Sequence, residues 1–179
     1  MAANPRQNGR GAEGGPLDAT NRRLLAELQR EARLTLAELG RRVGLSSPAV
    51  AERLQRLERQ GVIRGYRAEV DPRALGLALT AIIRSRPAPG QLRNVAELAR
   101  QTPEVVECHR ITGDDCYLMR AHLRDVEHLE EVIDRFAVLG QTTTSIVQSS
   151  PVPARGVEVG EEPARRAAVD DQGRPAAVA

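Results

Sequence analysis

The chain has 179 residues, of which 41% are hydrophobic, so it can bury the core of one ordinary domain or of two small ones. Its formal net charge is only +2, but residues 17–70 hold eleven arginines against seven acids and residues 71–150 hold nine against eleven. This uneven charge favours two domains, with nucleic acid as the partner of the first. A sheet that binds RNA stacks the bases on aromatic side chains, and this chain has only two tyrosines and one phenylalanine, which excludes that mode of binding.

The N-terminal part of the chain predicts a polar arm followed by a helix. Residues 1–16 are rich in Gly, Asn and Pro and hold almost no apolar side chain, so we expect a disordered arm. They lack the hydrophobic segment of a secretion signal, which predicts a cytoplasmic protein with no membrane partner. A helix is expected from Asp18, its N-cap, to about Ala32, with leucines at helical spacing on its buried side.

Residues 35–65 contain two short amphipathic helices joined by a Gly-containing turn, which is the pattern of a helix-turn-helix DNA-binding motif. Thr35 and Glu38 form a capping box, in which each side chain accepts the backbone N–H of the other residue. The first helix therefore begins at about residue 36. Gly44 supplies the permissive backbone that ends this helix.

The second helix of the motif is expected to expose one side and bury the other. Ser47 is its predicted N-cap and Pro48 its first residue, since proline lacks only an N–H that would have no partner there. Gly61 closes the helix. Together with the preceding helix, the motif predicts a three-helix domain of the winged helix-turn-helix type over residues 17–62. The inward residues of the second helix are Val50, Leu54 and Leu57.

Arginines before, along and after the second helix can bind phosphates, while one or two of them reach base edges. The chain has no lysine, so the inference depends on where the arginines stand rather than on their number. Two short helices joined by a Gly-containing turn also occur in helical bundles that bind no nucleic acid, and this alternative stays open. The candidate DNA contacts are Thr35, Arg41, Arg42, Ser46, Ser47, Ala49, Val50, Glu52, Arg53, Arg56, Arg64 and Arg67.

Residues 63–76 predict a short strand and a hinge, because VIRGYRAEV alternates and Asp71-Pro72 then breaks the pattern. Residues 77–152 predict the order βαββαβ, which is a ferredoxin-like domain with a four-stranded antiparallel sheet and two helices on one face. The whole chain is therefore expected to be α+β. We expect another copy of the protein to cover the other face of the sheet. Residues 153–179 lack periodicity and predict a disordered tail.

Five segments of the chain resemble one family of regulators. They are LD at 17–18, LLAELQREAR at 24–33, LAELGRRVGLS at 36–46, VAERLQRLERQGVIRGYRAEVDPRALG at 50–76 and ECHRITGDDCYL at 107–118. Over residues 17–150 the chain resembles the Lrp/AsnC family of bacterial and archaeal transcription regulators. The resemblance implies sheet domains that pair into dimers, dimers that often assemble into octamers, and an amino acid bound between dimers near a Gly-Asp turn. Asn21 stands where the family often has an acid, which we expect to affect only helix capping.

The hairpin turn departs from the family's usual motif, which resembles Gly-Asp-aromatic-Asp. Here an acid replaces the aromatic residue and a thiol replaces the second acid, so the effector is not identified by resemblance. A carboxylate in the turn can pair with the ammonium of an amino acid, and a free turn N–H can bind its carboxylate. Gly and Asp are also the default residues of a plain hairpin turn. The candidate effector contacts are Thr112, Gly113, Asp114, Asp115 and Tyr117.

The leading interpretation is a sequence-specific, oligomeric DNA-binding regulator that responds to an amino acid or a related metabolite. An architectural DNA-binding protein without an effector is the alternative, and the altered turn favours it. An enzyme built on the ferredoxin-like half is the third hypothesis, but no nucleophile, base and metal set is recognisable, so we expect no catalytic residue and no cofactor. Cys108 and Cys116 lack the spacing of a metal site, and we expect neither a metal nor a disulfide there.

Overall fold

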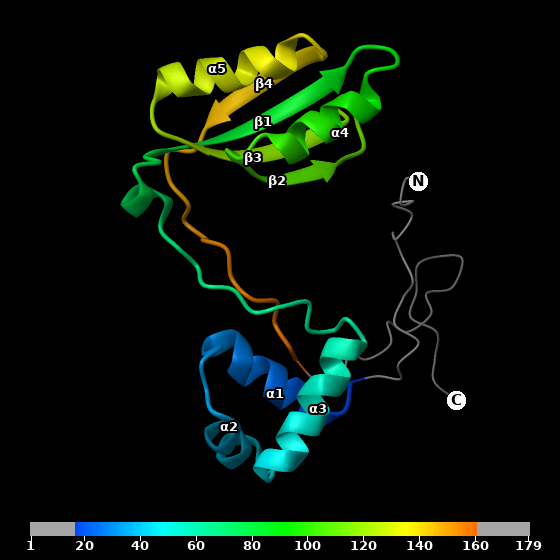
Figure 1. Cartoon of the computed structure of the whole chain (residues 1–179), viewed down its shortest axis with the longest axis vertical. Coiled ribbons are helices and arrows are strands. Elements are labelled where there is room, and N and C mark those ends of the chain that lie inside the picture. The colour runs from blue at the N-terminus through cyan, green and yellow to red at the C-terminus, as the bar shows by residue number, and fades with distance from the viewer. Residues whose placement is uncertain (1–16, 161–179) are drawn as a thin grey trace, which may run out of the picture. The chain divides into compact units, whose positions relative to one another are not determined.

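The computed structural model describes residues 17–160, which divide into two compact units (Figure 1). Within the described range, residues 17–67 and 154–160 form a helical unit, and residues 68–153 form a sheet unit. The predicted arm at 1–16 lies outside the described residues, as do residues 161–179 of the predicted tail. No helix among residues 17–160 is long and apolar enough to cross a membrane.

The helical unit contains α1 (Ala19–Arg30), α2 (Leu36–Val43) and α3 (Ser47–Arg59). Asp18 caps α1 and Thr35 caps α2, and each side chain accepts the backbone N–H three residues further on. Gly44 ends α2 in the left-handed conformation, at φ +76°. These caps confirm the predicted starts of the first two helices.

Two predicted caps differ in detail from the structure. The capping box at α2 is only half formed, because the Glu38 carboxylate pairs with the guanidinium of Arg41 instead of reaching back to the N–H of Thr35. The N-cap of α3 is Ser46 rather than Ser47, and its side chain makes no capping hydrogen bond. Ser47 and Pro48 therefore both lie in the first turn of the helix, where proline costs no hydrogen bond.

The turn between α2 and α3 is closed by a tight contact at Gly40. The N–H of Leu45 donates to the carbonyl oxygen of Gly40 at 2.9 Å. A side chain on residue 40 would overlap the carbonyl oxygen of Leu45 and touch Val50, which lies in the core of the unit. Only glycine fits at this position, and this requirement comes from the packing of the turn.

The strand predicted after α3 is absent from the described residues. Residues 64–71 have no regular secondary structure, and they are followed by a short 3-10 helix, η1 (Pro72–Leu75), that Asp71 caps. A strand requires a neighbouring backbone to exchange hydrogen bonds, and none of the described residues supplies one to this segment. The prediction was wrong because alternation shows only which side chains would share a face.

The sheet unit has the predicted order βαββαβ, in which the two central strands form a hairpin. Its strands are β1 (Leu79–Pro87), β2 (Val105–Arg110), β3 (Tyr117–Leu123) and β4 (Gly140–Ile146). Its helices are α4 (Leu92–Gln101) and α5 (Val126–Ala137). The strands lie in the order β2-β3-β1-β4, and every neighbouring pair is antiparallel.

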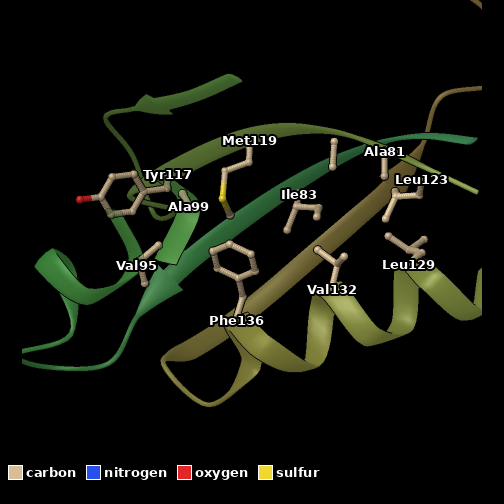
Figure 2. Packing of buried hydrophobic residues seen from close by; sticks show 11 residues of the cluster. Ala81, Ile83, Val95, Ala99, Tyr117, Met119, Leu123, Leu129, Val132 and Phe136 are labelled. Carbon is tan, nitrogen blue, oxygen red and sulfur yellow. The ribbon is translucent and has the colours of Figure 1, made fainter. Parts of the chain in front are cut away.

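One face of the sheet packs against both helices. The alternate residues of β3 are buried, as the sequence predicted, and in this core Met119 lies opposite Ile83 of β1 and Leu123 opposite Leu79. Phe136 of α5 is the largest fully buried side chain, and Figure 2 shows it pointing at the sheet. Burial of an aromatic side chain of this size stabilises the domain by about 3 kcal/mol. The helix-free face carries the other set of alternate side chains.

Residues 153–160 differ from the disordered tail predicted for them. The carbonyl oxygens of Val157 and Gly160 accept hydrogen bonds from side chains of α1, so this segment returns to the helical unit. Composition alone predicted disorder because the segment has no periodic apolar face. Its contacts use backbone oxygens, which a composition argument does not count.

Candidate nucleic-acid interface and ligand turn

The outward side of α3 offers a surface without core contacts. Pro48, Glu52, Gln55, Arg56 and Arg59 are exposed and recur at the three- and four-residue intervals of one helical side. Side chains near the N-terminus of the helix are small, so the helix backbone can approach a partner closely there. This is the shape that a recognition helix needs in a major groove.

Gln55 and Arg59 are exposed on this side but are absent from the candidate DNA contacts drawn from the sequence. A glutamine side chain can bind adenine through two hydrogen bonds in the major groove. Its spacing from Glu52 and Arg59 could have identified it, because all three positions fall on one side of the helix. The charge of the arginines dominates the pattern of this segment, and a neutral glutamine does not stand out beside it.

Val50 is a wrong candidate for a DNA contact, because its side chain is 0% exposed and packs in the core of the helical unit. The sequence placed Val50 both among the inward residues of the helix and among the DNA contacts, and the structure agrees with the inward assignment, which Val50 shares with Leu57. It contributes to the interface only by holding α3 against the other helices.

Arg53 is engaged within the helical unit. Its Nη1 atom lies 2.6 Å from the Asp18 carboxylate and donates to the side-chain oxygen of Asn21 at 3.0 Å. The hydrogen bond from Arg53 and the N–H of Asn21 hold the pKa of Asp18 below its ordinary value, against the opposing effect of burial. Asn21 therefore affects more than helix capping, because its N–H donates to the Asp18 cap while its side-chain oxygen accepts from Arg53 and links α3 to the start of α1.

Arg42 also forms ion pairs inside the unit. Its guanidinium donates to Glu27 at 2.9 Å and to Glu31 at 3.2 Å, and it lies 3.7 Å from Glu38. The hydrogen bond to Glu27 raises the pKa of Arg42 and lowers the pKa of Glu27. Arg42 thus joins α1 to α2.

The remaining arginine candidates are more exposed. Arg41 pairs with Glu38, and Arg56 lies 3.0 Å from Glu52 within the same helix. Exposed pairs of this kind contribute only about 0.2–1 kcal/mol, so a phosphate can displace the acid. The other exposed candidates are Thr35, Ser46, Arg64 and Arg67, while Ser47 and Ala49 are half-buried.

The turn between β2 and β3 is held by two arginines of β1. The Nε atom of Arg86 donates to the carbonyl oxygen of Asp114 at 2.9 Å, and its Nη2 atom lies 3.6 Å from the Asp114 carboxylate. Arg84 lies 3.6 Å from the carboxylate of Asp115. The sequence analysis missed both arginines, although their alternate positions on a strand that pairs with β3 place them on one face.

The tip of the turn is open to solvent. Thr112 and Gly113 are exposed, Gly113 has a φ of +108°, and the side chain of Asp114 is 93% exposed. The Asp115 side chain is only 21% exposed. Carboxylates, guanidinium groups and a permissive backbone therefore meet at one exposed corner of the sheet unit.

Tyr117 is the candidate effector residue that the structure assigns to the core instead. It is 6% exposed, and its hydroxyl donates to the carbonyl oxygen of Leu92 in α4 at 2.9 Å. Arg110 lies over the ring at 6.0 Å. The prediction was wrong because the alternation of β3 turns this residue to the helix-covered face, away from the turn.

Both halves of the chain match known protein families. Residues 17–64 match a family model described as winged helix-turn-helix DNA-binding, and residues 80–157 match the Lrp/AsnC ligand binding domain. An uncharacterized HTH-type transcriptional regulator of Bacillus subtilis, YezC, is 42% identical over 134 residues, covering 75% of this chain and 95% of YezC. The chain belongs to the Lrp/AsnC family.

Solved structures of Lrp/AsnC-type regulators have the same fold. LrpC of Bacillus subtilis superposes with a TM-score of 0.73 at 31% identity, covering 75% of this chain and 96% of LrpC. A regulator of Neisseria meningitidis, solved as a complex with L-Met, has a TM-score of 0.72 at 30% identity, covering 78% and 94%. This Lrp/AsnC protein is a DNA-binding transcriptional regulator, and its relatives are named as regulators rather than as enzymes.

The histidines, cysteines and acids of the described residues do not cluster. Within residues 17–160, no group of three or more His, Cys, Asp and Glu side chains could hold a metal ion. Cys108 and Cys116 are both free thiols, and burial raises the pKa of Cys108. A thiol with a raised pKa is a poorer nucleophile at neutral pH.

Proposed function

We propose that the protein binds duplex DNA with α3 in the major groove. The exposed side of α3 carries this proposal, because it combines a glutamine and arginines with small residues near the start of the helix. Gln55 and Arg56 are proposed to reach base edges, with the phosphates bound by arginines outside the ion pairs of the unit. Arg42 and Arg53 are proposed to position the helices. The proposed phosphate contacts are Arg41, Arg59, Arg64 and Arg67.

The experiment compares Gln55→Ala with Arg53→Ala on a duplex that the wild-type protein selects from a random pool. If Gln55 contacts a base, Gln55→Ala should weaken binding to the selected duplex by about 1–3 kcal/mol and relax specificity at one position. Arg64→Ala is the matched control for a phosphate contact, because it should weaken binding to selected and random DNA equally. Equal losses on both duplexes for Gln55→Ala would contradict the assignment of Gln55 as a base reader.

The helix-free face of the sheet is proposed to pair with a second copy of the chain, and dimers are proposed to assemble further. Ile82 and Leu118 lie there half-buried, and Thr80 shares a hydrogen bond of 3.0 Å with His122. Burial and the neighbouring Arg120 lower the pKa of His122, which favours the neutral ring that an interface accepts. Sedimentation of Ile82→Arg tests this pairing, and an unchanged dimer would contradict it.

An amino acid is proposed to bind at the turn between β2 and β3. Arg84 and Arg86 can bind its carboxylate, and the exposed carboxylate of Asp114 can bind its ammonium group. The similar regulator of Neisseria meningitidis is solved with L-Met, which supports an amino acid as the chemical class. By linkage, the amino acid and the DNA must alter each other's affinity by the same factor.

A thermal-shift screen of the twenty amino acids against wild type and Asp114→Ala tests this proposal. Binding should raise the melting temperature of the wild type, and Asp114→Ala should abolish the shift. The architectural role without an effector is the second candidate, because both acids of the turn already pair with arginines of β1. No shift with any amino acid would favour that second role.

A further inference from the structure

The last described segment, residues 154–160, is held by α1 although β4 before it belongs to the sheet unit. Gln29 donates to the carbonyl oxygen of Val157 at 3.0 Å, and Arg22 donates to that of Gly160 at 3.0 Å. The two donors are seven residues apart, which places them two turns apart on one side of the helix. We call residues 154–160 the C-terminal strap.

The strap fits α1 closely at Gly156. A Cβ atom at this position would overlap the amide end of the Gln29 side chain, which could turn aside only by giving up its hydrogen bond to Val157. It would also lie 3.2 Å from the Cβ atom of Gln29, which cannot turn aside. A side chain on Gly160, four residues further on, would meet no atom within 4 Å. The approach of the backbone to Gln29 is therefore specific to one position of the strap.

Arg22 links the strap to the start of the DNA-binding helices. Its Nη1 atom donates to the carbonyl oxygen of Gly160, and its Nε atom donates to the carbonyl oxygen of Leu17 at 2.9 Å. The next residue, Asp18, caps α1 and pairs with Arg53 of α3. The strap thus ends at the same corner of the helical unit that positions the proposed recognition helix.

Two stretches of chain join the two units (Figure 1). Residues 68–78 lead from the helical unit to β1, and residues 147–153 lead from β4 to the strap. At about 3.6 Å per residue, the first stretch spans at most about 40 Å and the second only about 25 Å. With the strap in place, the shorter stretch limits how far the helical unit can move.

We propose that the C-terminal strap is a second tether that restricts the helical unit and so strengthens the binding of two DNA half-sites by one dimer. The proposal rests on the dimeric DNA binding proposed above. When one helical unit of a dimer has bound its half-site, the other unit meets the second half-site at an effective concentration that the tethers set. A shorter tether raises this concentration, provided that it can span the distance between the half-sites. Binding of a single half-site gains nothing from the strap.

The test compares Gly156→Leu with the matched control Gly160→Leu in the full chain. The DNA is a duplex selected from a random pool by the wild type, used whole and as a single half-site. We expect Gly156→Leu to weaken binding to the whole duplex by about fivefold to tenfold, with Gly160→Leu equal to wild type. The single half-site should bind all three proteins equally, because each helical unit is intact.

A disulfide provides the reverse experiment. A Cβ atom on residue 156 would lie 3.2 Å from the Cβ atom of Gln29, a few tenths of an ångström short of the distance in disulfides. In a chain carrying Cys108→Ser and Cys116→Ser, the pair Gln29→Cys and Gly156→Cys should cross-link on oxidation. The oxidised protein should bind the whole duplex as tightly as the parent chain. The pair Gln29→Cys and Gly160→Cys is the control that should not cross-link.

Three results would overturn the proposal. Equal affinities of Gly156→Leu and Gly160→Leu for the whole duplex would show that the strap does not restrict the helical unit. Failure of the 29–156 pair to cross-link would show that the strap does not lie on α1. If the wild type binds the whole duplex no more tightly than the half-site, the proposed dimeric DNA binding is contradicted, and so is the role of the strap that depends on it.

Discussion

The two turns that carry the candidate sites are held in opposite ways. The turn between α2 and α3 is fixed by packing, since the Cα atom of Gly40 faces the carbonyl oxygen of Leu45 with no room for a side chain. The turn between β2 and β3 is open, since a side chain on Gly113 would meet no atom within 4 Å. Arginines of β1 hold this second turn by partly exposed ion pairs.

This difference shows what each turn can do. A turn fixed by backbone packing presents α3 in one orientation, which a reader of base edges requires. A turn held by ion pairs at 3.6 Å can exchange them for the charges of a ligand without losing core contacts. We therefore interpret the first turn as part of a rigid DNA-binding surface and the second as the place where a ligand can act.

The largest expected effect comes from filling the packed turn. Gly40→Ala should lower the free energy of unfolding of the helical unit by about 3 kcal/mol, because the new methyl group overlaps a backbone oxygen that cannot move alone. Gly113→Ala has a free site and should cost only about 1 kcal/mol for the strained φ. Urea unfolding measures both values, and equal costs would contradict the contrast between the turns.

A smaller effect is expected on ligand binding at the open turn. Arg86→Ala should weaken the binding of the amino acid that gives the largest thermal shift with the wild type about tenfold, because the guanidinium no longer supplies a charge-assisted hydrogen bond. Its cost in unfolding free energy should stay below about 1 kcal/mol, since the ion pair is exposed. Isothermal titration measures the affinity, and Arg93→Ala on α4 is an exposed arginine control. Equal effects of the two variants would remove Arg86 from the proposed site.

Local and periodic features of this fold could be predicted from the sequence. The caps at Asp18 and Thr35 depend on neighbouring residues, and the alternation of β3 depends on one buried face. The missing strand after α3 depends on a partner backbone, which no local pattern contains. Gly40 was missed for the same reason, because its neighbour Leu45 is brought close only when the turn folds.

The candidate site was harder to predict than the fold, since an arginine's role depends on which acid it meets. Arg42 and Arg53 have the spacing of DNA contacts, yet both pair with acids of α1. Arg84 and Arg86 stand on β1, yet they reach the turn that follows β2. The partners of Arg42 and Arg53 at α1 lie between 11 and 35 residues away, so sequence neighbours give no signal.

The smallest expected effect is a pH dependence that separates the positioning role of Arg53 from base contact. The pKa of Asp18 is lowered in the folded protein, chiefly by its hydrogen bond to Arg53. The resulting stability is present above the unfolded pKa of about 3.9 and is lost as the pH falls through the folded pKa. Because Asp18 is half exposed, we expect only about 0.5 kcal/mol.

Asp18→Asn is the variant that isolates this charge, because asparagine caps a helix as well as aspartate does. The difference in unfolding free energy between wild type and Asp18→Asn should be measurable at pH 7 and should shrink at pH 3. Arg53→Gln should lose the same pH-dependent part, and the double variant should lose no more of it than either single variant. A difference that is the same at both pH values would show that Arg53 does not stabilise the charge of Asp18, and would free its guanidinium for DNA.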